Sequence, residues 1–212
     1  MFYVWGGFNG QLPTELHILD PQTKIWEMIP QDVIGRKSIP YVVVDDKILS
    51  YGGNKSGGML IVDMPQKKVY VRITTGASPP SRVLDPGMTV YGKYLFYYGG
   101  RDTTTNHTFM YVCDTERYWW FIMHVLPDDE TVSMSDGIVC KIGLFMLPRL
   151  HSFSFLCEQR KRELYVFLGA PEKDQVPISV VQIYEPISIL NMRDDMLCAF
   201  EGDTGLKVSA FL

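Results

Sequence analysis

The residue types that could support acid–base, nucleophilic or metal chemistry are dispersed through this 212-residue sequence. No two of the four histidines lie at the spacing of metal ligands: His17, His107, His124 and His151. The sequence contains neither a GxSxG nucleophile motif nor an HExxH zinc motif. Its acidic pairs fall in predicted turns, where solvated charge is the ordinary explanation: Asp45-Asp46, Asp128-Asp129 and Asp194-Asp195. We therefore expect no catalytic residues, no bound metal and no cofactor.

The cysteines lie inside apolar stretches and form no CxxC pair: Cys113, Cys140, Cys157 and Cys198. We interpret them as small buried hydrophobes in a reducing compartment, and a disulfide or a metal site is the alternative. Cys113 and Cys157 occupy equivalent positions of the repeat described below, which favours packing. The sequon Asn106-His107-Thr108 would accept a glycan only in a secreted chain.

One glycine-rich segment superficially resembles a phosphate-binding loop. It runs from Gly52 to Gly58 and contains Lys55 followed by Ser56. A phosphate loop needs glycine immediately before that lysine and a helix immediately after it, so that backbone amides at the helix N-terminus face the phosphate. Asn54 precedes the lysine, and no helical pattern follows. The segment is therefore interpreted as a hairpin loop.

The predicted strands and turns that would position the histidines, acidic pairs and cysteines form a repeat. In its clearest copy, an apolar strand over 94–98 enters the pair Gly99-Gly100, and a second strand over 108–114 ends on Asp114. Trp120 follows six residues after that aspartate. Alternating apolar and β-branched runs separated by Gly, Pro, Asn and Asp predict an all-β chain.

Two further copies precede it. The glycine pairs are Gly6-Gly7 and Gly52-Gly53, so the first glycines of successive pairs lie 46 and then 47 residues apart. The strand-ending aspartates are Asp20 and Asp63, and six residues later come Trp26 and Val69. Such a fixed period is the sequence signature of a repeat architecture.

Two degraded copies follow. Residues 143–149 match the strand and glycine pair of the third copy, with Leu147-Pro148 in place of the glycines. Residues 153–158 match 109–114, and Leu164 takes the tryptophan position. Residues 194–202 echo 45–53, and 208–212 would form the next strand. The predicted units are 1–30, 39–73, 87–124, 137–169 and 178–212, in one domain, joined by loops over 30–40, 74–86 and 127–135.

This pattern resembles the kelch repeat over nearly the whole chain. The resemblance implies a kelch-type β-propeller of about four to five blades, each of four antiparallel strands, around a central channel. The family's glycine pair falls on the three pairs quoted above, its aromatic position on His17, Leu60 and Tyr111, and its tryptophan on Trp26 and Trp120. Closed kelch propellers typically have six or seven blades, so the ring is expected to be incomplete, irregularly closed or completed by another chain.

Composition restricts the partners. The net charge of −4 argues against a nucleic-acid footprint. No run approaches the roughly 20 apolar residues of a membrane helix, and the N-terminus lacks the features of a signal peptide. We expect a cytoplasmic protein, with a cytoskeletal or ciliary location as the finer prediction, that binds other proteins and neither nucleic acid nor membrane.

Partner contacts are expected on loops, because a rigid scaffold displays them. The polar loop 101–107 offers Arg101, Asp102 and His107. If Trp120 points inward, strand alternation sends Trp119 outward as a fourth candidate. The expected function is a non-enzymatic protein-interaction scaffold within a large assembly. The alternatives are a soluble adaptor presenting clients, for example to a ubiquitin ligase, and a metal-dependent enzyme on the same fold.

Overall fold

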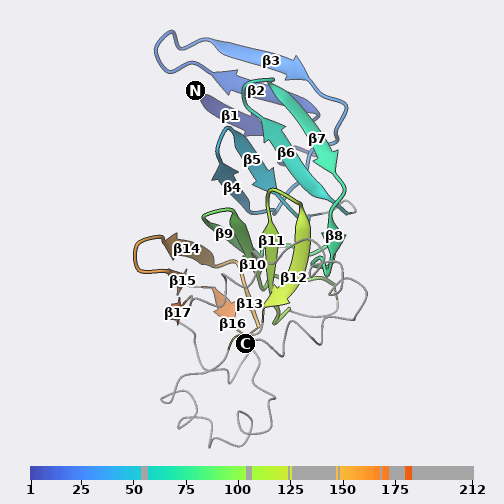
Figure 1. Ribbon diagram of the computed structural model, residues 1–212. Coiled ribbons are helices and arrows are strands. Elements are labelled where there is room, and N and C mark those ends of the chain that lie inside the picture. The colour runs from blue at the N-terminus through green and yellow to red at the C-terminus, as the bar shows by residue number, and fades with distance from the viewer. Residues whose placement is uncertain are drawn as a thin grey trace, which may run out of the picture.

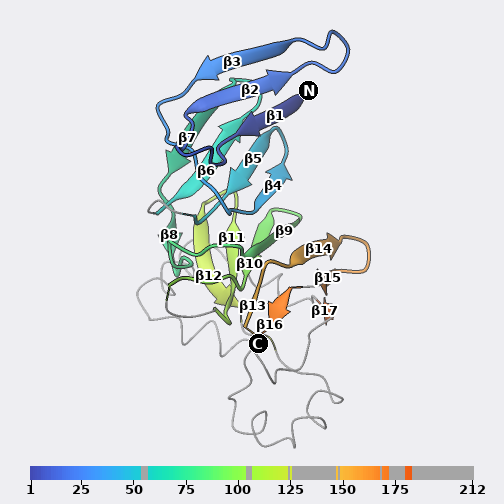
Figure 2. The ribbon, with the colours of Figure 1, turned by 180° about the vertical axis from the view of Figure 1, so that it is seen from behind.

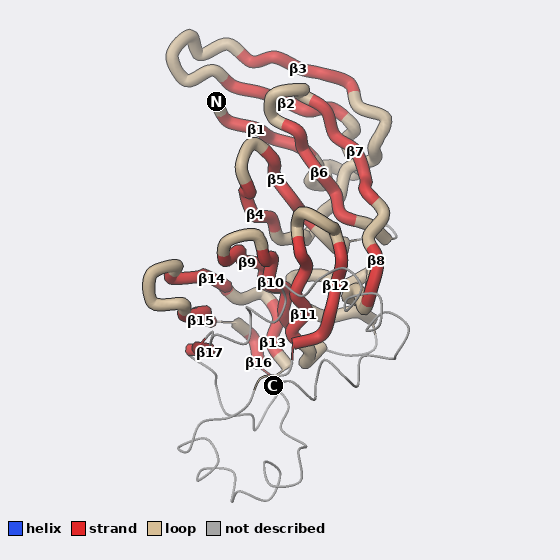
Figure 3. Tube along the Cα trace, viewed as in Figure 1, coloured by secondary structure: helices blue, strands red, loops and turns tan. Residues whose placement is uncertain are grey.

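The computed structural model describes residues 1–53, 57–103, 107–123, 125, 147, 149–167, 169–171 and 180–182. Within these ranges the chain consists of β-strands, turns and loops and has no helix (Figure 3). The all-β class predicted from the strand pattern is therefore confirmed for this part of the chain. The predicted strands over 194–202 and 208–212 lie outside it, as does the predicted loop 127–135.

The first sheet has three antiparallel strands in the order β1-β2-β3. They are β1 (Phe2–Trp5), β2 (Glu15–Leu19) and β3 (Trp26–Pro30). The second sheet has four antiparallel strands in sequence order. They are β4 (Tyr41–Val44), β5 (Lys47–Ser50), β6 (Met59–Asp63) and β7 (Lys68–Arg72). Strands that follow one another in the chain are neighbours in both sheets, which antiparallel pairing allows without a crossover.

The third sheet repeats the four-stranded arrangement and adds a fifth strand. Its antiparallel strands are β9 (Gly87–Tyr91), β10 (Tyr94–Tyr98), β11 (Met110–Asp114) and β12 (Trp119–Met123). The extra strand β8 (Thr75–Gly76) pairs in parallel with β12. The predicted loop 74–86 therefore also extends the outer edge of this sheet.

The fourth sheet corrects the sequence assignment after residue 150. Its strands are β14 (Ser154–Glu158), β15 (Glu163–Phe167) and β17 (Val180–Gln182), in that order. A small pair, β13 (Leu150–His151) with β16 (Ala170–Pro171), lies beside it. Residues 153–158 were predicted to match the third strand, β11, which lies between two neighbours. Instead β14 pairs only with β15 among the described strands and packs beside β9, the first strand of the third sheet.

The turn that follows explains the misassignment. Residue 162, four after Glu158, has a left-handed φ of 58°. Tyr118, four after Asp114, has a φ of 57°, so the two turns share a left-handed fourth residue and each follows an acidic residue. The local pattern cannot distinguish them, and the position in the sheet is decided by tertiary contacts. Cys113 and Cys157 are consequently not equivalent. The predicted glycine-pair counterpart at 143–149 lies outside the described residues except for Leu147 and Arg149.

The four sheets stack in chain order, with β1–β3 at one end and β13–β17 at the other (Figures 1 and 2). An apolar cluster fills each junction. The first junction contains Leu16, Ile18, Leu60, Val62 and Val69, the second contains Leu49, Tyr51, Leu95, Tyr97 and Trp120, and the third contains Phe96, Val112, Phe155, Leu164 and Val166. Sheets packed face to face bury side chains from both surfaces. The inner two sheets are accordingly covered on both faces.

Backbone hydrogen bonds repeat at each junction. The second glycine of each pair donates its N–H to a carbonyl at the start of the next sheet: Gly7 to Arg36 at 2.9 Å, Gly53 to Val83 at 3.0 Å and Gly100 to Leu150 at 2.7 Å. A second series links the residues that follow, from the Asp85 N–H to the Ser38 carbonyl at 3.1 Å and from the Ser152 N–H to the Asp85 carbonyl at 3.0 Å. These series place Leu150–Ser152 in the position of Val83–Asp85, which fixes β14 as a first strand.

The glycine pairs end β1, β5 and β10, and all six residues have positive φ. At Gly99, with φ of 66°, an added Cβ would lie 2.5 Å from the Leu150 carbonyl oxygen. Both the backbone conformation and the close approach of the next sheet therefore require glycine there. In the fourth sheet Gly169, with φ of 103°, takes the second glycine position after β15. Its signal in the sequence is the strand Leu164–Phe167 running into glycine.

The aspartates that end β6 and β11, and the one that follows β2, cap their turns. Asp20 accepts the Gln22 N–H at 2.8 Å, Asp63 accepts the Gln66 N–H at 3.0 Å, and Asp114 accepts the Glu116 N–H at 2.9 Å. Side-chain oxygens of Asp commonly close such turns. The predicted hairpin role of these residues is confirmed.

Candidate partner-binding surfaces

The described ends of the loop predicted to contact partners are hydrogen-bonded to neighbouring residues. The backbones of Arg101 and Leu84 form a two-way bridge, with N–O distances of 2.9 and 2.7 Å. The half-exposed Arg101 guanidinium lies 3.5 Å from the Asp85 carboxylate. His107 Nε2 lies 3.2 Å from Asp102 Oδ2, which joins the two ends of the loop. The structure thus places the three predicted loop residues together between the ends of the inner strands β10 and β11 of the third sheet.

Trp119 does not lie on the surface. Its side chain is 8% exposed and stacks on Phe121, with ring centroids 5.3 Å apart. Strand alternation does send it to the opposite face from Trp120, as predicted, since the two belong to different apolar clusters. That opposite face is covered by the fourth sheet. Trp119 is therefore a core residue, and its predicted exposure is wrong.

Trp26 is the exposed tryptophan instead. It corresponds to Trp120, and both follow the turn that begins at Asp20 or Asp114. Trp120 is fully buried, and Tyr51 of the preceding sheet contacts it with ring centroids 5.0 Å apart. Trp26 is 54% exposed, because no described residue stacks a sheet on that side.

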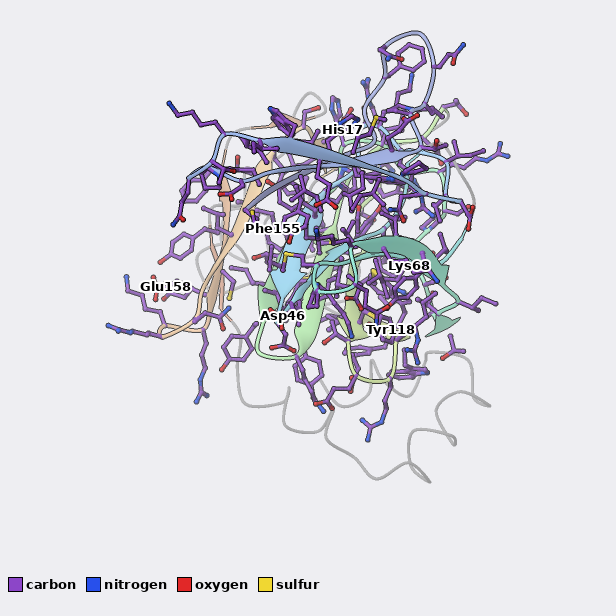
Figure 4. All side chains as sticks on the ribbon, turned by 90° about the horizontal axis from the view of Figure 1, so that it is seen from above. His17, Asp46, Lys68, Tyr118, Phe155 and Glu158 are labelled. Carbon is purple, nitrogen blue, oxygen red and sulfur yellow. The ribbon has the colours of Figure 1, made fainter. Side chains whose placement is uncertain are left out.

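Trp26 belongs to a continuous apolar face. Cross-strand pairing places Phe2, Leu19 and Trp26 in one row, and Val4, His17 and Met28 in the next. Phe2, Val4 and Met28 are exposed, and His17 contacts Trp26 edge-on at 6.5 Å. We call these six residues the outer face of the first sheet; His17 marks it in Figure 4. Contiguous exposed apolar surface of this kind marks interaction sites.

Sequence reasoning missed this face because it treated every repeat unit as covered on both sides. The pattern Phe2-Tyr3-Val4-Trp5 is apolar at both alternating positions. A strand with one solvated face normally alternates apolar and polar residues. The uninterrupted apolar run is therefore the signal of a second packing partner.

The edge of the first sheet is also open. In the second and third sheets, β5 and β10 each pair with a preceding strand, β4 and β9. No described residue pairs with the corresponding edge of β1. An edge strand with free N–H and C=O groups is a template for strand addition.

A buried arginine lies beside the first junction. Arg36 is 4% exposed, and its Nη1 donates to the Gly52 carbonyl at 3.1 Å. Burial lowers the pKa of this guanidinium. Among the described residues no carboxylate pairs with it, while the equivalent positions hold Val83 and Leu150. A buried unpaired cation is costly to the fold.

The two described cysteines are packing residues. Burial raises the pKa of the thiol of Cys113 and that of Cys157, the latter to about 11, and both are free cysteines. Cys140, Cys198 and His124 lie outside the described residues. Within the described ranges no three His, Cys, Asp or Glu side chains are grouped so as to hold a metal ion. The same part of the chain has no helix long and apolar enough to cross a membrane.

No family model matches this sequence, and it has no significant match among curated proteins.

Proposed function

We propose that this chain is a non-enzymatic protein–protein interaction scaffold, a structural subunit of a larger assembly built on a kelch-type propeller. The observation that carries the proposal is the outer face of the first sheet. Trp26 on that face is half-exposed, while the equivalent Trp120 is sealed by a neighbouring sheet. Leaving such a face in water forgoes roughly 1.5–3 kcal/mol for each large side chain that a partner could cover.

Three features support the kelch-type propeller within this proposal. The glycine pairs, the capped aspartate turns and the junction hydrogen bonds repeat in register from sheet to sheet. A propeller stacks four-stranded antiparallel sheets in this way around an axis. The open edge of β1 is the position that a further strand would occupy.

The soluble adaptor is the second candidate, and the loop that carries Arg101, Asp102 and His107 favours it. Arg101 lies near Asp85 and His107 lies near Asp102, so the described residues at the two ends of this loop are already positioned, which lowers the entropic cost of binding a client. Charge reversal at Arg101 would then abolish client binding, and the outer-face variants described next would not.

The test is the native mass of the protein after gentle extraction from the cells that make it. Tagged wild-type chain and the variants Trp26→Glu and Ile73→Glu are compared, Ile73 being an exposed residue away from the outer face. A structural subunit predicts that wild type and Ile73→Glu are recovered in a complex well above 24.3 kDa and that Trp26→Glu is released from it. Recovery of all three as monomers would contradict the proposal. Partition of the complex into the detergent-resistant fraction tests the cytoskeletal or ciliary setting.

A further inference from the structure

The last described sheet has an apolar face against which no other described sheet packs. Phe155, Leu164 and Val166 point into the third junction, so their neighbours along β14 and β15 point away from it. Leu156 and Phe167 are exposed, and Phe167 stacks flat on Tyr165 at a centroid distance of 5.8 Å. Glu158 lies at the turn beyond this face (Figure 4). We call Leu156, Tyr165 and Phe167 the outer face of the fourth sheet.

The junction between the second and third sheets shows which side chains pack against such a face. There Val42, Leu49 and Tyr51 cover Leu95, Tyr97 and Trp120, all within one buried cluster. Tyr51 makes the central contacts, edge-on to Tyr97 at 5.9 Å and to Trp120 at 5.0 Å. Its hydroxyl donates to the Pro79 carbonyl at 3.0 Å, which anchors it.

The two outer faces correspond, residue by residue, to the two sides of the junction between the second and third sheets. Counting back from the glycines Gly53 and Gly169, Tyr51 corresponds to Phe167 and Leu49 to Tyr165. Counting forward from Ser38 and Ser152, which have φ of 53° and 55°, Val42 corresponds to Leu156. The pairings Val42 with Leu49 and Leu156 with Tyr165 are the same cross-strand step.

The first sheet supplies the opposite half. Its row Phe2, Leu19 and Trp26 has the same pairing as Leu95, Cys113 and Trp120 in the third sheet. The outer face of the fourth sheet therefore corresponds to the second-sheet side of that junction. The outer face of the first sheet corresponds to the third-sheet side. Figures 1 and 2 show β1–β3 and β13–β17 at opposite ends of the stack of described sheets.

We propose that the outer face of the first sheet binds a second copy of this chain, through the outer face of that copy's fourth sheet. The copies associate head to tail and continue the sheet stacking that already exists within each chain. Phe167 of one copy lies over Trp26 and Val4 of the next, as Tyr51 lies over Trp120 and Tyr97. Because the two surfaces differ, the interface is heterologous. This inference rests on the proposed function and names its partner.

Sedimentation equilibrium of the purified full chain tests the pairing with two single variants, Trp26→Glu and Phe167→Glu. Both positions are exposed, so a charge there leaves the core of each chain intact. We expect the wild-type mass to rise with concentration to two chains or more and each variant alone to remain a monomer. An equimolar mixture of the variants forms particles of two chains and stops there. Each such pair retains one unaltered interface and places both glutamates on its free faces.

Ile73→Glu is the control and associates like wild type. Met28→Glu and Leu156→Glu form an independent second pair, for use if either first variant unfolds. Monomeric wild type at millimolar concentration, or a mixture that fails to recover association, would overturn the inference. If the purified chain is monomeric while the extracted complex still depends on Trp26, the scaffold function stands with a foreign partner and only the self-pairing fails.

Discussion

Trp26 and Trp120 occupy the same position in two sheets of one chain, yet Trp26 is half-exposed and Trp120 has no exposed surface. The difference is the presence of Tyr51 from the preceding sheet over Trp120 and the lack of any described counterpart over Trp26. The same sheet position is thus covered by a neighbouring sheet at Trp120 and left without a described neighbouring sheet at Trp26. That contrast is the physical basis of the proposed scaffold role.

Truncating these tryptophans separates their roles. Trp120→Ala leaves a cavity at the second junction and is expected to lower the free energy of unfolding by about 3–5 kcal/mol. Trp26→Ala in dilute monomer is expected to cost less than about 1 kcal/mol, because the side chain is already half in water. Urea unfolding followed by circular dichroism measures both. Equal losses would show that the outer face is covered within the chain.

Replacing two left-handed glycines by alanine separates the energetic cost of the backbone conformation from that of the close contact between neighbouring sheets. Gly92→Ala, at φ of 55° with open space around the new Cβ, is expected to cost roughly 1–2 kcal/mol for the backbone conformation alone. Gly99→Ala adds a Cβ 2.5 Å from the Leu150 carbonyl oxygen and should cost at least twice as much. Chemical denaturation of both variants checks the ratio. A loss at Gly99 no greater than at Gly92 would remove the evidence for a tight third junction.

Two buried tyrosines should respond oppositely to loss of the hydroxyl. The Tyr97 hydroxyl is buried without a hydrogen-bond partner among the described residues, so Tyr97→Phe should hold or raise the free energy of unfolding. Tyr51→Phe removes the hydrogen bond to the Pro79 carbonyl and leaves that oxygen without this donor. The free energy of unfolding should fall by about 1–3 kcal/mol. Thermal unfolding distinguishes them. A destabilising Tyr97→Phe would imply that the hydroxyl has a partner.

Alkaline pH should destabilise the protein. Burial raises the pKa values of Tyr97, Tyr98 and Cys113, so these groups stay protonated in the folded chain while their unfolded counterparts ionise. Stability from these groups is complete below the unfolded values, about 8.5 for Cys and 10 for Tyr, and falls above them. Each contributes a slope of up to about 1.4 kcal/mol per pH unit.

Urea unfolding at pH 7, 9 and 10.5 measures this effect. The unfolding free energy should be lower at pH 10.5 than at pH 7, and Tyr97→Phe should show a shallower decline because it removes one titrating group. A value unchanged between pH 7 and pH 10.5 would contradict the burial of these side chains.

The features that local chemistry dictates were predictable from the sequence. Glycine pairs with positive φ, aspartate-led turns and apolar strands each follow from a few neighbouring residues. The burial of Trp119 was not predictable, because alternation specifies which face a side chain occupies and leaves open what covers that face. The predicted place of β14 is wrong for a related reason, since the turn after it has the same length and the same left-handed fourth residue as the turn after Asp114. Tertiary contacts decided both.

The most direct test of the scaffold proposal compares native masses after gentle extraction, with wild type, Trp26→Glu and Ile73→Glu side by side. A structural subunit predicts a heavy complex for wild type and Ile73→Glu and its loss for Trp26→Glu, with the monomer equally stable in all three. A Trp26→Glu chain that remains in the complex would contradict the assignment of the outer face as the docking surface. Monomers throughout would contradict the scaffold role itself.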